Sequence, residues 1–335
     1  AIQGIRPFYN NHASVNNWFP EVQLDHKALM DYRYQDCINL MAVGIRLADA
    51  VHTVSPSYKD DVLLPSRRPE FIGGESLEID LQKADNEGRL FGILNASNYG
   101  NIRVAEKGLL YRNTVKALFR WLQDTSKKYK ADFLAHTGEK IMQYVGNRPK
   151  FIVSSVARLT EQKFYFLKRS PEAFEKMLAR LNEVEGIFML LGTGDPDYEE
   201  FFREMSYKHK NFIFTNGQSE DLIDSMYLET DLYFMPSLFE PCGISQMLAM
   251  RNGNPCLVHH TGGLKDTVEH MKTGFAFAGE TYDEQIKNMV TSFDEALTIW
   301  EKDKPTWKKI QANAKKARFT WDKSLDEYYK SLYLL

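Results

Sequence analysis

The chain has 335 residues, and its 43% hydrophobic and 26% charged residues are typical of a globular protein. This length predicts two domains, each large enough for a core of its own. The 42 basic and 45 acidic residues give a net charge of −3, so no long-range field favours nucleic acid or an anionic membrane. Three cysteines without a CxxC pair favour a reducing compartment over a disulfide framework or a zinc site. No apolar run approaches the roughly 18 residues that a membrane-spanning helix needs.

The first part of the chain combines helical segments with two short strands. A helix is predicted over residues 35–49, followed by a strand at 50–54. A second short strand is predicted at 90–94. Residues 107–144 form a charged helical pattern, and the Gly-Asn-Arg-Pro run at 146–149 ends it. We therefore expect a new domain to begin there.

A regular alternation of strands and helices follows residue 149. We predict strands at 151–156, 186–191, 212–214, 232–235 and 255–258, and helices at 171–184, 198–207, 219–228 and after Gly263. This alternation predicts a doubly wound parallel sheet, in which ligands bind beyond the carboxyl ends of the strands. The tail at 321–335 is helix-like, and we expect its packing face to include Tyr328, Tyr329, Leu332 and Tyr333.

The most informative segment is Phe-Glu-Pro-Cys-Gly-Ile-Ser-Gln at 239–246, which follows the strand predicted at 232–235. A strand, a turn containing a carboxylate, a Pro and a Gly, and then a helix are typical of a ligand site in an α/β protein. Glu240 would lie at the mouth of a crevice. The Gly243 amide could approach a ligand closely, because glycine has no Cβ.

Two cations, Arg158 and Lys163, follow the first strand of the second domain and are predicted to share one loop. A planar guanidinium and a compact ammonium at the carboxyl end of a strand suit a diphosphate. The alternative is a pair of solvated surface charges, which is the commoner outcome for such residues taken alone.

Two glycine-containing turns follow later strands. The Leu-Gly-Thr-Gly-Asp-Pro run at 191–196 lacks the third glycine of a dinucleotide fingerprint, so a structural turn is the better interpretation. Thr261, Gly262 and Gly263 follow a strand and open a helix, where main-chain amides can bind a phosphate. A plain N-cap explains Thr261 equally well.

These candidates all fall at the carboxyl ends of strands in one predicted sheet. They can therefore converge on one crevice, which unrelated surface loops would not be expected to do repeatedly.

Several longer runs resemble the bacterial glycogen synthase and plant starch synthase family of retaining glycosyltransferases. VARLTEQK, LLGTGDPDYEE, DLYFMPSLFEPCGISQMLAM and HHTGGLKDTV resemble the C-terminal domain of that family. AIQGIRPF, NLMAVGIRLADAVHTVSPSY and FGILNASNY resemble the second half of its N-terminal domain. The resemblance covers nearly the whole chain, with the motifs in the same order.

The resemblance implies an α/β fold of two Rossmann-like doubly wound domains, known as GT-B, with the N-terminal domain incomplete. Residues 1–147 would form the C-terminal part of the N-terminal, acceptor-side domain. Residues 148–316 would form the nucleotide-sugar-binding domain. Residues 317–335 would be a helix that returns to the N-terminal domain.

The implied reaction is transfer of glucose from ADP-glucose, or from UDP-glucose, to the non-reducing end of an α-1,4-glucan with retention of configuration. Arg158 and Lys163 would hold the diphosphate, and Glu240 would bind hydroxyls of the glucose. Further donor contacts are implied for Cys242, Gly243, Thr261, Gly262, Gly263 and Asn95, the last although Ala96 stands where the family usually has Gly. We expect no cofactor or metal, no nucleic-acid or membrane partner, and a cytoplasmic location, with a plastid left open.

The chain also departs from the family pattern. It begins just after the family's His-Asn pair and lacks the glycine-rich loop with a donor-binding lysine, so we expect a fragment with an unpaired sheet edge and an exposed apolar face. Phe164 replaces the usual Gly, and Gln218 stands where an aromatic residue commonly stacks on the base. The alternative function is therefore an incomplete remnant that only binds nucleotide sugar or glucan.

Overall fold

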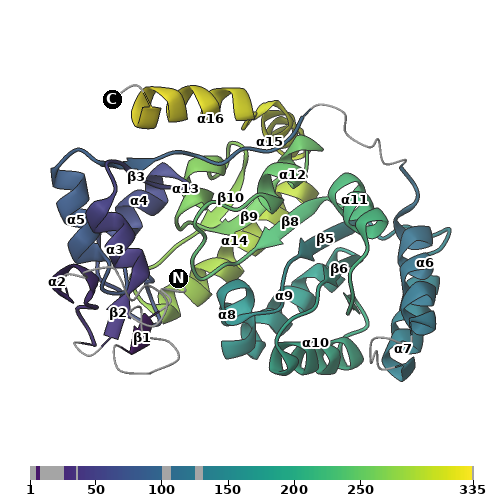
Figure 1. The fold of residues 1–335 in the computed structure, drawn as a ribbon. Helices are drawn as coiled ribbons and strands as arrows, with labels where there is room; N and C mark the ends of the chain where they lie inside the picture. Colours follow the sequence, from purple (N-terminus) through teal and green to yellow (C-terminus); the bar gives the residue numbers. More distant parts are fainter. Residues whose placement is uncertain (1–4, 8–25, 35–36, 100–106, 125–130, 334–335) are drawn as a thin grey trace.

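The structure is a computed structural model that describes residues 5–7, 26–34, 37–99, 107–124 and 131–333 (Figure 1). Within that part of the chain, the C-terminal unit is built on a six-stranded parallel sheet of order β10-β9-β8-β5-β6-β7. Its strands are β5 (Phe151–Val156), β6 (Gly186–Leu191), β7 (Phe212–Thr215), β8 (Leu232–Met235), β9 (Cys256–His259) and β10 (Gly274–Phe277). The chain therefore builds outward from β5 to β7, crosses back beside β5, and builds outward again to β10, as in a doubly wound fold.

The strands form because their residues are almost continuously apolar and are covered on both faces. Every residue of β6, β7, β8 and β9 is buried. Aromatic rings fill the core on one side of the sheet, where Phe174 contacts both Phe188 and Phe212 edge-on. This packing fixes the carboxyl ends of the strands rigidly in space.

The helices of this unit connect the strands. They are α8 (Glu161–Arg169), α9 (Pro171–Glu183), α10 (Pro196–Lys208), α11 (Glu220–Glu229), α12 (Ser245–Arg251), α13 (Gly263–Thr267), α14 (Tyr282–Lys302) and α15 (Lys304–Lys316). Proline in the first turn starts α9 and α10, where its missing N–H costs nothing.

The sequence prediction was wrong about the segment that carries Lys163. Instead of lying on a loop with Arg158, Lys163 lies in the first turn of α8, after Thr160 in an extended N-cap conformation. The helix is kinked at Phe164, whose non-helical backbone lets its ring become fully buried. A large apolar side chain at this position thus explains the local geometry.

The N-terminal unit contains two small sheets in the described residues. β1 (Ile5–Pro7) pairs with β2 (Cys37–Asn39) antiparallel, and β3 (Val51–Thr53) pairs with β4 (Leu90–Gly92) in parallel. Its helices are α2 (His26–Leu29), α3 (Leu40–Leu47), α4 (Pro56–Val62) and α5 (Glu78–Asn86).

The helix predicted over residues 35–49 is shorter than expected. Residues 35–36 lie outside the described residues, Cys37–Asn39 is the strand β2, and α3 begins at Leu40. Asn39 causes this change, because its side chain accepts hydrogen bonds from the amides of Met41 and Ala42.

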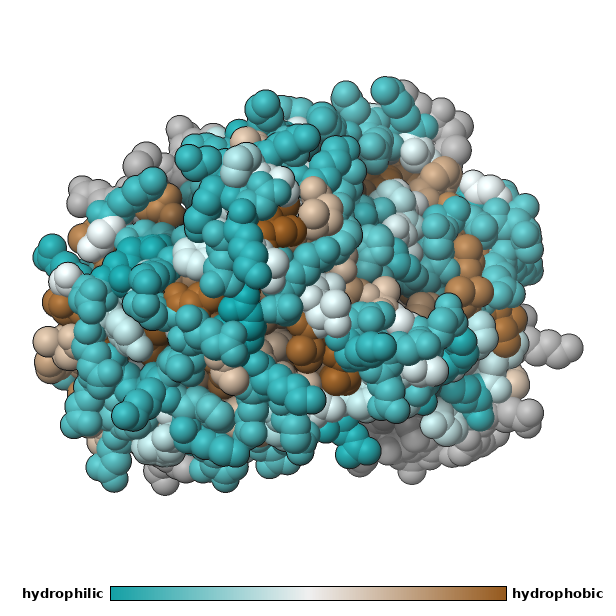
Figure 2. All heavy atoms as spheres, turned by 180° about the vertical axis from the view of Figure 1, so that it is seen from behind, coloured by the Kyte–Doolittle hydropathy of each residue, from teal (hydrophilic) through white to brown (hydrophobic). Residues whose placement is uncertain are grey.

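Apolar side chains are exposed on the helix α3, whereas the exposed sheet face expected from the sequence stays a prediction. Leu40, Met41 and Leu47 are 54%, 44% and 71% exposed. The face of the whole molecule opposite to the view of Figure 1 is mainly hydrophilic, with separate apolar patches (Figure 2). None of the described helices is long and apolar enough to cross a membrane.

The helices α6 (Leu110–Gln123) and α7 (Ala131–Met142) lie side by side (Figure 1) and pack on a face of the sheet formed by β5, β6 and β7. Buried Lys140 fastens α7, because its ammonium donates to the carbonyls of Ser206 and His209 at 2.6 and 2.8 Å. Burial lowers the pKa of Lys140 to about 8. The helix α7 is thus held against the end of α10.

The C-terminal segment crosses back to the N-terminal unit as α16 (Trp321–Tyr328) and a π-helical turn, η1 (Tyr329–Tyr333). Ser324 donates to the carbonyl of Leu94 at 2.6 Å, and the Tyr328 ring meets His52 edge-on. Tyr329 and Tyr333 do not belong to the packing face, because they are 60% and 74% exposed.

Two carboxylates, those of Asp266 and Asp61, form hydrogen bonds that join the N-terminal and C-terminal units. Asp266 accepts from the amide and hydroxyl of Ser57 at 2.9 and 2.7 Å. In the other direction, Asp61 accepts from the Gly262 amide at 2.8 Å and from the Lys265 ammonium at 3.0 Å. Each carboxylate thus satisfies a main-chain N–H group of the opposite unit, and no local sequence pattern predicted this pairing.

The contacts of Asp61 across the two units are expected to contribute to the free energy of unfolding. Replacing Asp61 by Ala would leave the buried Gly262 amide without its partner, at a cost of about 1–3 kcal/mol in the free energy of unfolding. Urea denaturation measures this change. Replacement of the neighbouring, exposed Asp60 by Ala serves as the control, with a change within about 0.5 kcal/mol. Equal transitions for the two variants would contradict the role given to Asp61.

Candidate functional site

The candidate site opens where β5 and β8 separate. β5 pairs with β6 along its whole length but with β8 only at Val153 and Ser154. Beyond that point the buried Tyr233 hydroxyl donates to the Val156 carbonyl at 2.9 Å and accepts from its amide at 3.3 Å. Tyr233 therefore replaces the missing strand partner and lets the two loops diverge.

A cavity of about 270 Å³ lies between the diverging loops. Its lining combines strand ends, the start of α8 and the start of α12: Ser155, Val156, Ala157, Arg158, Lys163, Phe164, Tyr233, Met235, Pro236, Ser237 and Ser245. Both predicted cations are among these residues. Arg158 is exposed and has no ion-pair partner among the described residues.

Glu240 lies beside Lys163 and forms an ion pair with it. The Glu240 carboxylate is only 7% exposed, and it also accepts from the buried Ser237 hydroxyl at 3.0 Å. The ammonium offsets much of the desolvation that a buried carboxylate suffers. The structure thus brings Glu240 and Lys163 together, and it adds Ser237, which no sequence motif had indicated.

Gly262 and Gly263 allow the loop after β9 to lie against the Glu240 turn. A Cβ on Gly262 would come within 2.0 Å of the Glu240 carbonyl oxygen, and one on Gly263 within 2.4 Å of the Cys242 Cα. Gly262 also has a φ of 46°, which disfavours any side chain there. These glycines are therefore required by close packing of two loops.

The amides of this loop have partners other than a ligand. Gly262 donates to Asp61, Gly263 donates to the Glu240 carbonyl at 2.9 Å, and the Thr261 amide donates to the His259 carbonyl. In this structure the three amides therefore hold the loop and the two units together. A phosphate could use the Gly262 and Gly263 amides only by displacing these acceptors.

Gln246 is a residue that the sequence analysis missed. Its fully buried side-chain amide donates to the carbonyls of Cys242 and Gly243, both at 3.0 Å, and to Thr267 at 3.2 Å. Gly243 has a φ of 76°, and a Cβ there would contact the Gln246 amide at 2.5 Å. Gln246 thus fixes the turn that carries Glu240, and a glutamine at the start of an otherwise apolar helix was the available signal.

Asn95 reaches the same turn from the N-terminal unit through its main chain. The Asn95 carbonyl accepts a weak hydrogen bond from the Cys242 thiol at 3.9 Å. Burial raises the pKa of Cys242 to about 12, so the thiol stays protonated. The Cys242 side chain therefore packs between the units rather than acting as a nucleophile.

A second cavity, of about 380 Å³, continues from the first. The two cavities share Val156, Ala157 and Arg158. The second cavity extends along the carboxyl ends of β6 and β7 to Gly217 and Gln218. Arg158 thus lies where a small cavity lined by two cations meets a larger, more apolar pocket.

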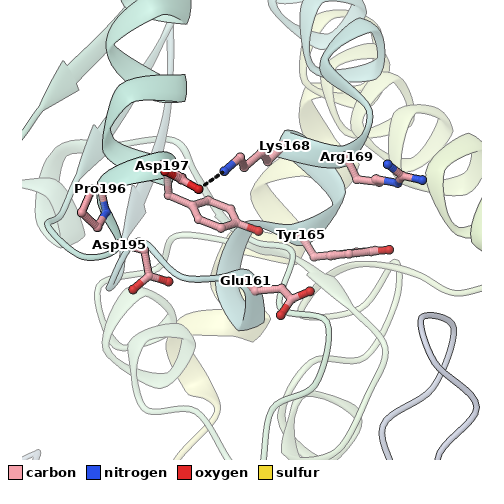
Figure 3. Close-up of a pocket in the computed structure, with 8 residues that line it drawn as sticks. Glu161, Tyr165, Lys168, Arg169, Asp195, Pro196 and Asp197 are labelled. Carbon is pink, nitrogen blue, oxygen red and sulfur yellow. Dashed lines mark ion pairs between the residues drawn. The ribbon is translucent and has the colours of Figure 1, made fainter.

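A third and larger cavity, of about 640 Å³, lies on the outer side of α8 (Figure 3). Glu161, Tyr165 and Arg169 border it from α8, and Lys168 points toward Asp197 at the start of α10, 3.9 Å away. With three carboxylates against two cations in its lining, this cavity suits a diphosphate less well than the cavity lined by Arg158 and Lys163. Its size alone does not make it the donor site.

His259 supports the site from behind. Its ring is 5% exposed, its Nδ1 lies 2.9 Å from the Ser237 carbonyl, and it stacks near Phe277. Burial lowers the pKa of His259 to about 4, so the ring is neutral. Its Nδ1–H donates a hydrogen bond to the Ser237 carbonyl. No group of three His, Cys, Asp or Glu side chains among the described residues could hold a metal ion.

Comparison with protein families gives two matches that divide the chain. Residues 138–317 match the family described as glycosyl transferases group 1, and residues 1–83 match the starch synthase catalytic domain. The glycogen synthase of Streptococcus sanguinis is 35% identical over 312 residues, which is 90% of this chain and 60% of the relative. That of Thermosipho africanus is 28% identical over 93% of this chain and 62% of the relative. The chain thus spans about 60% of the length of these relatives.

Solved structures agree on the fold. The catalytic domain of starch synthase IV from Arabidopsis thaliana, bound to ADP and acarbose, superposes with a TM-score of 0.70 at 24% identity, over 98% of this chain and 64% of that one. Anabaena HepE in complex with UDP and glucose gives a TM-score of 0.55 at 17% identity, over 88% and 66% of the two chains.

The fold is thus the two-domain α/β architecture of GT-B glycosyltransferases, with a partial N-terminal domain. The chain belongs to the glycosyl transferases group 1 family, and its first 83 residues are similar to the starch synthase catalytic domain.

The buried His259 predicts a pH dependence of stability. Because the pKa of His259 in the folded chain, about 4, lies below the usual histidine value of 6.5, only the unfolded chain binds a proton between these pH values. At about 1.4 kcal/mol per pKa unit, stability falls by about 3 kcal/mol as pH drops from 6.5 to 4. Urea denaturation at a series of pH values should show a smaller loss for His259→Asn than for the wild type. Identical pH profiles would contradict the assignment.

Proposed function

We propose that this chain carries the donor-binding machinery of an ADP-glucose-dependent α-1,4-glucan synthase, which transfers glucose to the non-reducing end of the glucan with retention. The observation that carries the proposal is the convergence of Arg158, Lys163 and Glu240 on the opening between β5 and β8. The similarity to the starch synthase catalytic domain and to curated glycogen synthases supports it.

In this proposal the two cations hold the donor diphosphate. Arg158 is exposed at the junction of the two cavities, so its guanidinium can grip phosphate oxygens without first losing a partner. Lys163 lies deeper and would shift from Glu240 toward the phosphates. Both charges would stabilise the negative charge that develops as the nucleoside diphosphate leaves.

Glu240 would then bind hydroxyls of the glucose. When Lys163 turns to the phosphates, the carboxylate retains Ser237 and gains acceptor capacity for sugar hydroxyls. The Cys242 and Gly243 amides, with Asn95 from the N-terminal unit, would border the sugar. We assign Thr261, Gly262 and Gly263 a supporting role, since their amides already hold Asp61, Glu240 and His259.

Each segment of the chain would have its own role. Residues 148–316 would bind the nucleotide sugar, residues 1–147 would belong to the acceptor side, and residues 317–335 would join the two. The cytoplasmic location expected from the sequence stays a prediction.

A second candidate is a chain that binds nucleotide sugar or glucan without transfer. Two observations support this second candidate: the N-terminal unit is partial, and the chain covers 60% of the Streptococcus sanguinis relative. Transfer and binding must therefore be measured separately.

The test is incorporation of glucose from radiolabelled ADP-glucose into glycogen. It uses this chain, and this chain joined to the part of the Streptococcus sanguinis relative that it does not match. We expect incorporation at least by the joined protein, and a loss of about a hundredfold or more in the Glu240→Ala variant, because that side chain is placed to contact the reacting sugar. Asp197→Ala, in the outer cavity of Figure 3, should leave the rate unchanged.

Three outcomes separate the candidates. Incorporation that depends on Glu240 supports the synthase. Binding of ADP-glucose by both proteins without incorporation supports the second candidate. Absence of both binding and incorporation contradicts the proposed function altogether.

A further inference from the structure

The cavity beyond Arg158 has the properties of a site for a flat heteroaromatic ring. Its walls include the aliphatic side chains of Val156, Leu191 and Ile223. Its rim is polar, with Thr193, Gln218, Ser219 and Glu220. Apolar walls with a few polar groups at the edge are typical of pockets for ring-shaped ligands.

The position of this cavity fits the base of the nucleotide. It shares Arg158 with the smaller cavity that contains Lys163. A diphosphate held between Arg158 and Lys163 would therefore direct the nucleoside into the larger pocket. This inference rests on the proposed function, because it assumes that a nucleoside diphosphate occupies the crevice.

Gln218 is the residue best placed to contact the edge of the ring. Its side chain is exposed and extends across the mouth of the pocket, from the loop after β7 to the loop after β6. Its only hydrogen bond within the described part of the chain is from the side-chain nitrogen to the Thr193 hydroxyl, at 3.4 Å. That distance is long for a hydrogen bond, so the amide can turn toward a ligand at little cost.

The main chain beneath Gln218 is held firmly by α6. The Trp121 indole N–H donates to the Gln218 carbonyl at 3.1 Å, and the Trp121 ring is 6% exposed. A Cβ on Gly217 would come within 2.3 Å of that ring, so only glycine lets the loop lie against it. The backbone at 217–218 is thus fixed, while the Gln218 side chain remains able to rotate.

We propose that Gln218 recognises the hydrogen-bonding edge of the donor's nucleobase, and that the pocket accepts adenine and uracil with similar affinity. A side-chain amide carries both a donor and an acceptor, and rotation exchanges their positions. Adenine and uracil each present a donor next to an acceptor, so the amide can pair with either base.

The composition of the pocket supports weak discrimination. None of the eleven residues that line it is aromatic. An aromatic ring would stack over the larger purine face and favour adenine, whereas the aliphatic side chains present here contact either base less selectively. The pocket therefore selects less strongly between adenine and uracil by size and stacking. The contact with the Gln218 amide then determines how tightly each base binds.

Isothermal titration calorimetry of this chain with ADP and with UDP tests the proposal. We expect dissociation constants for the two nucleotides that agree within about fivefold, because the same amide pairs with both bases. Gln218→Leu should weaken both by about 3- to 10-fold, the range of one net hydrogen bond. Gln218→Tyr should raise the affinity for ADP relative to the affinity for UDP by about 3- to 10-fold, because the tyrosine ring stacks on the purine.

Asp197→Asn is the matched control, since Asp197 lines the separate outer cavity of Figure 3 and should leave both dissociation constants unchanged. Unchanged affinities in Gln218→Leu, or a wild-type preference for one nucleotide of more than about thirtyfold, would overturn this inference alone. If neither nucleotide binds the wild-type chain, the proposed function is contradicted and this inference fails with it.

Discussion

The site depends on one constraint, the reversal of strand order between β5 and β8. Because the chain builds the sheet outward from β5 in one direction and then in the other, the loops after β5 and β8 leave toward opposite sides. The backbone of Val156 would lose its ladder partner at that point. The buried Tyr233 hydroxyl bonds to both its N–H and its carbonyl, and so keeps the opening stable without closing it. Arg158, Lys163 and Glu240, which are proposed to act on the diphosphate and the glucose, all lie at this opening.

The charged side chains at the opening can exchange their contacts with each other for contacts with a ligand. Lys163 and Glu240 neutralise each other in the structure, whereas Arg158 remains exposed. A diphosphate would meet Arg158 first, and would then compete with Glu240 for Lys163. The carboxylate released from the ammonium still has the Ser237 hydroxyl, which His259 supports through the Ser237 carbonyl. Contacts outside the Lys163–Glu240 pair, including those of Asp61 with Gly262 and of Gln246 with Cys242, hold the loops, so this pair and Arg158 are left to exchange partners.

The sequence predicted the sheet well because its strands are buried apolar runs. The segments 151–156, 186–191 and 232–235 were predicted with the bounds that the structure has. The strand β10 was missed, because Gly274–Phe277 is short and begins with glycine. Placing Lys163 on a loop was wrong because an extended Thr160 can start a helix that a local pattern does not reveal. The contacts of Asp61 with Gly262, and of Trp121 with Gln218, join residues that are far apart in sequence, so no local pattern could predict them.

The central claim is that the opening between β5 and β8 holds a nucleoside diphosphate between Arg158 and Lys163. A crystal structure of this chain with ADP tests it most directly. The account predicts density for the diphosphate within hydrogen-bonding distance of both cations, with the base beside Gln218. Density for ADP in the outer cavity of Figure 3, or a diphosphate bound away from Arg158 and Lys163, would contradict the account.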